Sequence, residues 1–427
     1  MPTTFLLRGG RFIDPSTSSD EGRDILIIDG RIEKTGLALA APQGCEVVDL
    51  KGKVVAPGFM DMHVHLREPG FEHKETIETG TMSAAYGGFT AVCCMPNTNP
   101  AIDDESIVRF VQSQGNAANG GIVDVHPIGA VTKGRAGKEL SAIAELVQAG
   151  AVGLSDDGAP VYDAEIMRRA LEYAGMFRVP VIQHCEEPTL FHGGVMNEGF
   201  VSTELGLPGI PPVAEEIMIS RDILLTEYTG ALYHVAHMST AGSVRLVREA
   251  KKKGIRITCE VTPHHFSLSD DAVRSFDTNT KMNPPLRTQR DIEAIFEGLR
   301  DGTVDVIASD HAPHSLDEKE VDYLQAPFGI VGLETAVGLA MTGLVHTGVI
   351  TLPQLIAKFS TNPRRIVGRE IKVAEGVPAN LTFIDPEMPW QVSTASFKSK
   401  SKNSPFDGRQ LKGKAIGIFN HGKLLLT

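Results

Sequence analysis

The chain has 427 residues, a formal net charge of −12 and 42% hydrophobic residues. This length exceeds that of one small domain, and a barrel-type α/β domain can fill most of it around a large buried core. The acidic balance argues against nucleic acid and against an anionic membrane as partners, because both attract basic surfaces.

The cysteines and the first residues bear on the cellular compartment. None of the five cysteines forms a CxxC pair, and most lie in apolar runs, which is typical of a reduced compartment. The opening "MPTTFLLRGG" lacks the charged region and long apolar stretch of a signal peptide. No apolar run approaches the roughly 20 residues that a membrane-spanning helix needs. We therefore expect a cytoplasmic protein with no membrane partner.

Both ends of the chain have the pattern of short strands joined by turns. Residues 1–53 contain "FLLRGGRFID", "DILIIDGRIEKTG" and "CEVVDLKGKVV", and Asp29-Gly30 is typical of a tight hairpin. Residues 366–427 contain "ANLTFIDP" and "AIGIFNHGKLLL". Neither end alone offers enough strands for a stable sheet. We therefore expect one small β-sandwich domain built from both termini, rather than two unrelated β extensions.

Residues 54–365 alternate between apolar runs and helical patterns. The runs are "VVAPGFMDMHVH", "TAVCCMP", "VDVHPIGAV", "AVGLSDDG", "VPVIQHCE", "ALYHVAHM", "RITCEVTPHH" and "DVIASDH". Amphipathic stretches such as "EIMRRALEYAGMF" and "QRDIEAIFEGLRDG" lie between most of them. This alternation predicts a (β/α)8 TIM-type catalytic barrel. A doubly wound open sheet is the alternative, but no glycine-rich phosphate-binding motif follows an early strand.

Polar side chains gather where the predicted barrel strands end. In barrels of this kind, the chemistry lies at the C-terminal ends of the strands. Histidine or aspartate stands there on five of the predicted strands: His63 and His65 on the first, Asp156 and Asp157 on the fourth, His184 on the fifth, His237 on the sixth and Asp310 on the eighth. We expect these side chains to converge at one mouth of the barrel.

This set of side chains indicates metal chemistry. Imidazoles and carboxylates without thiolates suit Zn²⁺ or Mn²⁺ in a hydrolytic site. His63 and His65 are two residues apart, so in a strand they face the same side and can reach one ion. Four histidines and two carboxylates suffice for two ions that share a carboxylate. Each motif alone also fits a structural histidine pair, an Asp-Asp-Gly turn, or a capping histidine such as His234.

Arg67 lies on the same strand face as the two histidines. Its guanidinium could hold a substrate carboxylate through two parallel hydrogen bonds. The simpler interpretation is a salt bridge to Glu68 or Glu72.

Further candidates for substrate contacts follow other strand-like stretches. Asn97 in "MPNTNP" and Asn283 in "KMNPPLR" could bind an amide substrate, although asparagine beside proline is also common in turns. His314 in "SDHAPH" comes just after Asp310. Segment 312–330 is polar and irregular, which is typical of a lid.

Taken together, these motifs resemble a known family. The stretches "DMHVHLREPG", "MPNTNP", "SDDG", "HCEE", "HVAHMST", "EVTPHH", "KMNPPLR", "IASDHAPH" and "APFGIVG" are similar to those of the amidohydrolase superfamily and, within it, of the bacterial type I dihydroorotases. The similarity covers nearly the whole chain. It implies the reversible, zinc-dependent hydrolysis of (S)-dihydroorotate to N-carbamoyl-L-aspartate in pyrimidine (UMP) biosynthesis.

The resemblance also implies a role for each matching residue. His63 and His65 would bind one zinc ion and His184 and His237 a second, with Asp157, the second aspartate of "SDDG", as the bridge and Asp310 as both ligand and catalytic base. The substrate would contact Arg67, Asn97, Asn283, His314, Phe328 and Gly329. Many superfamily members bridge the metals with a carboxylated lysine on strand four. Strand four ends in aspartate here, which favours the dihydroorotases over the hydantoinase-like branch.

Two other functions also fit parts of this sequence. Another cyclic amidase, such as allantoinase or dihydropyrimidinase, would need no clamp for a ring carboxylate. A non-catalytic scaffold for aspartate transcarbamoylase would be expected to lose metal ligands, whereas every candidate ligand is present here. We further expect a homodimer, and an association with aspartate transcarbamoylase is possible.

Overall fold

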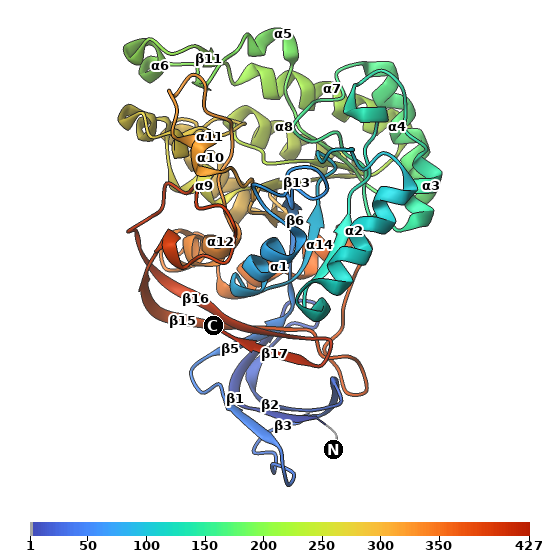
Figure 1. The fold of residues 1–427 in the computed structure, drawn as a ribbon, viewed down its shortest axis with the longest axis vertical. Coiled ribbons are helices and arrows are strands. Elements are labelled where there is room, and N and C mark those ends of the chain that lie inside the picture. Colours follow the sequence, from blue (N-terminus) through green and yellow to red (C-terminus); the bar gives the residue numbers. More distant parts are fainter. Residues whose placement is uncertain (1–2) are drawn as a thin grey trace.

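A computed structural model describes residues 3–427 and places a barrel above a small β domain (Figure 1). The strands of the barrel are β6 (Phe59–Val64), β7 (Phe89–Cys94), β8 (Asp124–Pro127), β9 (Val181–Gln183), β12 (Tyr233–Val235), β13 (Ile257–Val261) and β14 (Val306–Ile307). All residues of β6 and β7 are buried. Burial on both faces is characteristic of parallel strands covered by helices, and it explains the continuous apolar runs of the sequence.

Isolated parallel bridges close the ring of strands. β6, β7 and β8 pair in that order, and β9, β12, β13 and β14 form a second parallel set. Leu154 joins the two sets, because it bridges to Gly129 after β8 and to Val181 in β9. His311 after β14 bridges to Val64 in β6 on the other side. The segment at Leu154 therefore acts as the fourth strand, and the predicted TIM-type barrel is confirmed.

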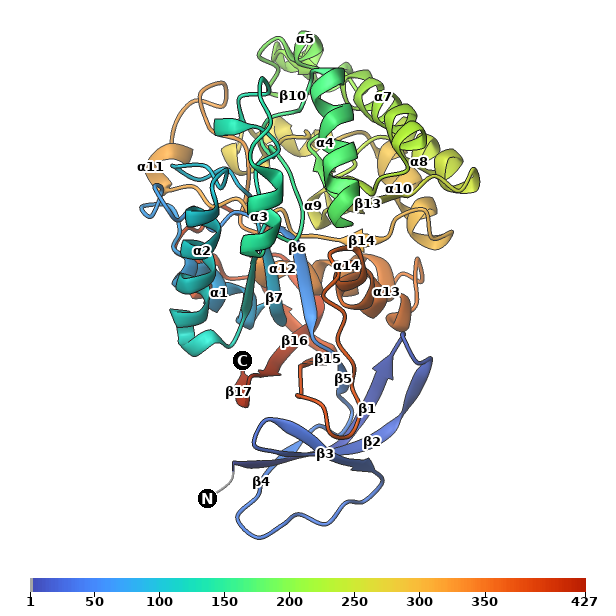
Figure 2. The same cartoon turned by 90° about the vertical axis from the view of Figure 1, so that its right-hand side faces the viewer.

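Helices cover the outside of the barrel (Figure 2). They are α1 (Ile77–Tyr86), α2 (Glu105–Ala117), α3 (Ile143–Ala149), α4 (Ala164–Phe177), α7 (Val213–Thr229), α8 (Ala241–Lys252), α10 (Gln289–Arg300), α12 (Leu333–Ala340), α13 (Leu352–Phe359) and α14 (Thr361–Ile366). Shorter elements lie in the connecting loops: α5 (Pro188–Phe191), β10 (Met196–Asn197), α6 (Phe200–Leu205), β11 (Gly209–Ile210), α9 (Pro263–Ser267) and α11 (Leu316–Lys319).

Helix α4 illustrates how the sequence determines these helices. It begins after Asp163, whose carboxylate accepts hydrogen bonds from the backbone N–H groups of Glu165 and Ile166. It ends at Arg178, which adopts the left-handed conformation with a φ of 57°. Its buried side chains recur at helical spacing and belong to the main core: Met167, Ala170, Leu171 and Ala174.

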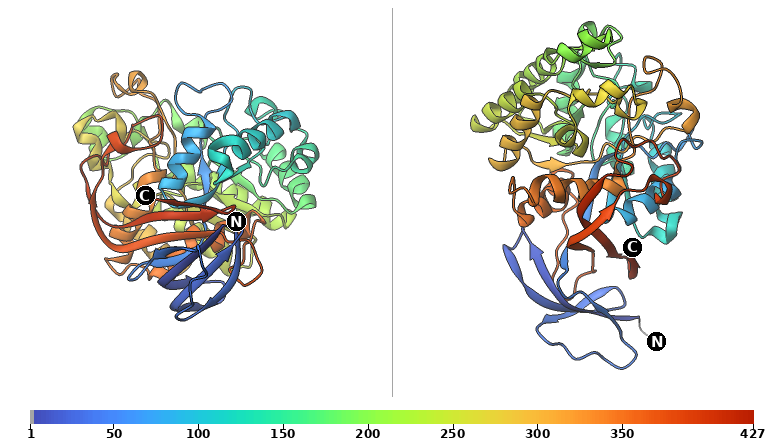
Figure 3. Two further views of the ribbon diagram at one scale, coloured as in Figure 1. Left: turned by 60° about the horizontal axis from the view of Figure 1, so that its bottom comes forward. Right: turned by 90° about the vertical axis from the view of Figure 1, so that its left-hand side faces the viewer.

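The two ends of the chain build one small β domain beneath the barrel (Figure 3). Its strands are β1 (Thr4–Asp14), β2 (Ser19–Ile28), β3 (Arg31–Gly36), β4 (Glu46–Asp49), β5 (Val54–Pro57), β15 (Leu381–Gln391), β16 (Gln410–Asn420) and β17 (Lys423–Leu426). Their order is β17-β16-β15-β5-β1-β2-β3, with β4 beside β1. The pairing of β5 with both β1 and β15 joins the two termini. β5 also leads directly into the first barrel strand.

Local turn chemistry in this domain agrees with the sequence. β2 and β3 pair in antiparallel fashion around Asp29 and Gly30, whose φ angles are 50° and 75°. The domain limits at 53/54 and 365/366 remain a prediction. No helix within residues 3–427 is long and apolar enough to cross a membrane.

Candidate metal centre and active site

The predicted metal ligands lie together at the mouth of the barrel. His63 is in β6 and His65 follows that strand. Asp157 follows Leu154, His184 follows β9, His237 follows β12, and Asp310 follows β14. All six side chains are buried. The C-terminal ends of parallel barrel strands meet at one face, so residues far apart in the sequence become neighbours there.

Two groups of side chains are close enough to hold metal ions. His63, His65 and Asp157 form one group, and Asp157, His184 and His237 form the other. Within each group, the potential ligand atoms lie within 4.8 Å of one another. Asp157 belongs to both groups, which is the arrangement that a bridging carboxylate requires.

Asp157 faces both groups through its Oδ1 atom. This oxygen lies 3.3 Å from Nε2 of His63 and 3.5 Å from Nε2 of His237. Oδ1 of Asp310 lies 3.5 Å from Nε2 of His63 and 3.1 Å from Nε2 of His65. A second carboxylate therefore stands beside the first group.

The electrostatics of the centre fit a bound cation. Burial opposes a charge on His63, yet Asp157, Glu260 and Asp310 together raise its pKa well above the usual value. Burial likewise opposes the charge on Asp157, but His63 and His237 hold the pKa of its carboxyl well below the usual range. Nε2 of His63 and Oδ1 of Asp157 are buried without a hydrogen-bond partner in the described chain. Nitrogen and oxygen donors of this kind suit zinc.

The structure distinguishes the two aspartates of "SDDG". Asp156 turns away from the centre, and its carboxylate accepts hydrogen bonds from the backbone N–H and the hydroxyl of Thr132. Only Asp157 reaches the histidines. This placement agrees with the choice of Asp157 as the candidate ligand.

A cavity of about 310 Å³ opens over the metal-binding groups. It is lined by the candidate ligands His65, Asp157, His184, His237 and Asp310, by the candidate substrate residues Arg67, Asn97, Asn283, His314, Phe328 and Gly329, and by Gly158, Ala312 and Pro327. His63 lies behind this lining, with no exposed surface. The structure therefore brings together the residues predicted as metal ligands and substrate contacts, whereas Asp156, which the sequence also placed at this mouth, lies outside the group.

Arg67 contributes a buried positive charge to this cavity. Its Nε donates to the backbone oxygen of Pro313, and its terminal nitrogen lies 3.4 Å from Nε2 of His314. Within the described residues it forms no ion pair, so the alternative of a salt bridge to Glu68 or Glu72 is wrong. Burial lowers the pKa of Arg67 to about 10, which leaves it charged at neutral pH.

The two asparagines contact the histidine ligands. Oδ1 of Asn97 lies 2.8 Å from Nδ1 of His65, so the ring N–H donates to the amide oxygen. Nδ2 of Asn283 donates to Glu186 at 2.7 Å and lies 3.4 Å from Nε2 of His184. Asn97 lines the cavity, and within residues 3–427 its amide N–H donors have no protein acceptor.

Segment 312–330 forms one wall of the cavity and is held by two buried lysines. Nζ of Lys319 donates to the carbonyls of Thr278 and Pro327, and Nζ of Lys281 donates to those of Tyr323 and Leu324. Burial lowers the pKa of Lys319 to about 7 and that of Lys281 to about 8.

The wall ends at Gly329, which has a φ of 118°. A Cβ atom there would lie 2.6 Å from Cβ of Ala312, so only glycine fits this close approach. The neighbouring carbonyl of Phe328 accepts a hydrogen bond from Nε2 of His314 at 2.8 Å. Whether the segment opens as a lid remains a prediction.

Sequence reasoning missed two charged residues that contact the site. Glu260 in β13 lies 2.6 Å from Nδ1 of His63, and Arg135 donates to the backbone carbonyls of Asp156 and Asp157. Burial opposes the charge on Glu260, but His63 and His234 hold its pKa at about 2. The sequence offered one signal for Glu260: it is a carboxylate inside the otherwise uncharged stretch "ITCEV" of a buried strand.

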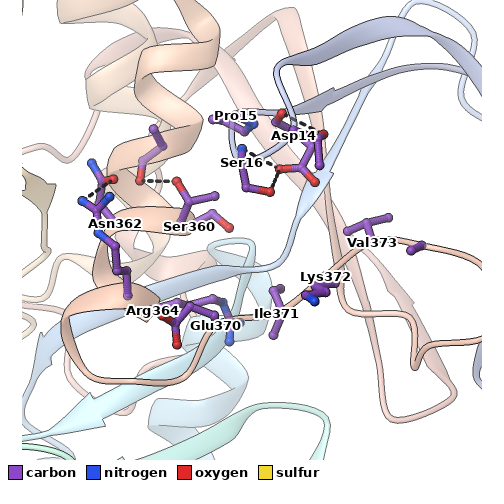
Figure 4. Close-up of a pocket in the computed structure, with 15 residues that line it drawn as sticks. Asp14, Pro15, Ser16, Ser360, Asn362, Arg364, Glu370, Ile371, Lys372 and Val373 are labelled. Atoms are coloured by element: carbon purple, nitrogen blue, oxygen red, sulfur yellow. Dashed lines mark hydrogen bonds between the residues drawn. The ribbon is translucent and has the colours of Figure 1, made fainter.

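A larger cavity of about 710 Å³ is lined by residues at the end of β1, in α14 and in segment 370–374 (Figure 4). Several of its polar side chains bind one another or the backbone. Asp14 accepts from Ser16, Asn362 donates to the carbonyl of Asp305, and Arg364 donates to that of Gly58. The metal-binding groups found within residues 3–427 are those at the opposite end of the barrel. The smaller cavity is therefore the candidate active site.

Comparisons with known proteins agree with this geometry. The "Dihydro-orotase-like" family matches residues 52–243. A dihydroorotase of Pelotomaculum thermopropionicum is 55% identical over 99% of this chain and 98% of its own length. One of Pelobacter propionicus is 51% identical over 98% of this chain and 99% of its own length.

Solved structures with the same fold include an L-hydantoinase (dihydropyrimidinase) from Arthrobacter aurescens. It has a TM-score of 0.88 and 23% identity over 100% of this chain and 96% of its own. A dihydropyrimidinase from Brevibacillus agri has a TM-score of 0.83 and 22% identity over 99% of this chain and 95% of its own. The barrel, the terminal β domain and the histidine–aspartate groups define a metal-dependent hydrolase of the amidohydrolase superfamily. Within that class, the chain belongs to the dihydroorotase family.

Proposed function

We propose that the chain catalyses the reversible hydrolysis of (S)-dihydroorotate to N-carbamoyl-L-aspartate, a step of pyrimidine (UMP) synthesis, with two zinc ions. One observation carries the proposal: Arg67 brings a buried, unneutralised positive charge to the cavity that also holds both metal-binding groups. Dihydroorotate is a cyclic amide that bears a carboxylate, so it needs both features at once.

Zinc is the metal that these donors favour. His63 and His65 would hold one ion, His184 and His237 the other, and Asp157 would bridge them. When bound, the two ions supply an activated water and polarise the carbonyl beside the ring methylene.

Side chains of the cavity would bind and orient the substrate. Arg67 and Asn97 would bind the substrate carboxylate and fix the orientation of the ring. Asn283, His314 and the backbone at Phe328 and Gly329 would contact the rest of the ring.

Asp310 would move the proton. Its Oδ1 faces His63 and His65, which leaves Oδ2 to accept the proton of the attacking water. It would then return this proton to the departing ring nitrogen. The same groups acting in reverse order would close the ring of N-carbamoyl-aspartate.

Two rival functions fit the site less well. Allantoinase or dihydropyrimidinase substrates carry no ring carboxylate and would leave the charge of Arg67 buried and unpaired, which is costly. A non-catalytic scaffold has no need of the complete set of candidate ligands. A homodimer, an association with aspartate transcarbamoylase and a cytoplasmic location remain predictions.

The experiment that tests the proposal combines two measurements on one purified sample. It follows ring opening of dihydroorotate and ring closure of N-carbamoyl-aspartate, and it counts zinc per chain. We expect turnover in both directions with about two zinc ions per chain. Metal-loaded protein without turnover in either direction would contradict the proposed activity of this chain.

A further inference from the structure

Glu260 is a fully buried carboxylate at the centre of the barrel, directly beneath the metal-binding groups. It lies in β13, and its side chain has no exposed surface. Its Oε1 lies 2.6 Å from Nδ1 of His63 and 3.4 Å from the backbone nitrogen of His237, while its Oε2 lies 3.2 Å from Nε2 of His234. His63 lies in β6 and His234 in β12, and His237 follows β12. One carboxylate therefore connects residues from both metal-binding groups.

The contact with His63 fixes the state of its ring. A carboxylate can only accept hydrogen bonds, so Nδ1 of His63 must carry the proton. In a neutral imidazole, the other nitrogen, Nε2, then presents its lone pair. Nε2 is the atom that lies 3.3 Å from Oδ1 of Asp157 and has no hydrogen-bond partner in the described chain. Glu260 thus sets the tautomer that a metal ligand requires.

His234 holds the other side of the same carboxylate. Its Nε2 faces Oε2 of Glu260, and its Nδ1 lies 2.8 Å from the hydroxyl of Thr258. Both ring nitrogens of His234 are therefore engaged below the metal-binding groups, and His234 is not a candidate ligand. With Oε2 occupied by His234, Oε1 stays directed at His63.

We propose that Glu260 is a positioning residue for the whole metal centre, acting on one metal-binding group through the ring of His63 and on the other through the backbone of His237. This inference rests on the proposed function, because it assumes two divalent ions. Those ions bring four positive charges into a buried site where Asp157 and Asp310 supply two negative ones. The carboxylate of Glu260 adds a third without occupying a ligand position. Outer carboxylates that orient histidine ligands typically change metal affinity by roughly 10- to 100-fold when they are removed.

The test measures zinc binding by metal-free protein. Glu260→Gln keeps the shape of the side chain and an acceptor oxygen but removes the negative charge. The matched control is Asp222→Asn, which makes the same chemical change at another fully buried carboxylate, one that binds Arg221 and the hydroxyl of Tyr233. Zinc affinity is measured by competition with a chelator, and the melting temperature of each metal-free protein is measured alongside.

We expect E260Q to bind zinc roughly 10- to 100-fold more weakly than the wild type. We expect D222N to lower the melting temperature while its zinc affinity stays within about twofold of the wild type. The cobalt-substituted E260Q protein should also show a shifted visible spectrum, because a neutral amide holds the ring of His63 less firmly than a carboxylate does and makes it a weaker electron donor. Glu260→Asp is the second variant. It keeps the negative charge, but its side chain is one methylene shorter, so the carboxylate lies farther from His63. It should weaken zinc binding as well.

The outcomes separate this inference from the proposed function. If E260Q and E260D bind zinc as tightly as the wild type and only lose stability, Glu260 is a structural ion-pair partner and the inference is wrong. If the wild-type chain itself binds no zinc, the proposed function fails and the inference fails with it.

Discussion

Oδ1 of Asp310 lies 3.1 Å from Nε2 of His65 at the mouth of the barrel. The other nitrogen of the same ring donates to Asn97, so Nε2 of His65 presents its lone pair rather than a proton. Asp310 has a φ of 49°, a conformation that non-glycine residues rarely adopt. Strained backbone of this kind is concentrated at functional sites, where the surrounding structure enforces it. The carboxylate is thereby held beside the metal-binding group with one oxygen available for proton transfer.

Replacing Asp310 with asparagine should abolish turnover while most of the metal stays bound. The amide keeps an oxygen toward the centre but cannot accept the proton of the attacking water. A positioned general base contributes roughly 10²- to 10⁴-fold to a rate, so we expect a loss of about that size in kcat. The measurement is kcat in both directions with zinc counted per chain. Near-normal turnover by a metal-loaded variant would rule out the role in proton transfer.

The two neighbouring aspartates of "SDDG" should give opposite results when each is changed to asparagine. Asp157→Asn removes the carboxylate shared by both metal-binding groups, so we expect zinc to fall below two per chain and turnover to disappear. Asp156→Asn weakens the contacts with Thr132 and should lower the melting temperature with zinc content retained. Metal counting on both variants checks this. Equal metal loss in the two would mean that the pair acts through backbone placement rather than ligation.

Replacing Arg67 with methionine should weaken the binding of carboxylate-bearing substrates above all. A charge-assisted hydrogen bond contributes about 1.5–3 kcal/mol, which corresponds to a rise in KM of roughly 10- to 100-fold for dihydroorotate. Arg11→Met is the matched control, because Arg11 forms an exposed ion pair with Asp20 in the small β domain. Its KM should equal that of the wild type. An unchanged KM for dihydroorotate in the Arg67 variant would show that Arg67 does not bind the substrate carboxylate.

The architecture and the candidate ligands could be predicted from the sequence because each depends on short-range pattern. Buried parallel strands give continuous apolar runs, and in a barrel the residue that ends such a run lies at the mouth. Because the fourth apolar run ends at "SDDG", the sequence alone predicts an aspartate close to the histidines. The choice of Asp157 over Asp156 came from the resemblance, and the structure gives its physical basis in the contacts with Thr132.

Contacts that span the barrel could not be predicted in this way. Glu260 lies 197 residues from His63 in the sequence, and nothing in the local pattern of β13 names its partner. The contacts of Lys281 and Lys319 could not be predicted either. Their ammonium groups donate to backbone carbonyls, so no acidic residue in the sequence indicates a partner. The alternative of a salt bridge from Arg67 to a nearby glutamate is wrong for a related reason. Glu68 and Glu72 are near in sequence, but their carboxylates accept backbone N–H groups instead.

Lys319 provides a pH-dependent prediction away from the metal centre. Burial, together with the nearby charge of Lys281, lowers its pKa to about 7 from the ordinary 10.5, although Asp277 and Glu318 act in the opposite direction. Between these two pH values the unfolded chain binds more protons at this residue than the folded chain. The free energy of unfolding therefore rises with pH through this range, because the charged form is the one that burial disfavours.

Lys319→Met removes the titrating group together with its hydrogen bonds to Thr278 and Pro327. We expect the variant to melt below the wild type, and the gap between the two melting temperatures to widen from about pH 6 to about pH 9. Lys281 is present in both proteins and burial is what lowers its pKa, so most of its contribution cancels in the difference. The same substitution at the exposed Lys252 should give a difference that does not change with pH. A gap that narrows as the pH rises would show that the ammonium form of Lys319 stabilises the wall of the cavity.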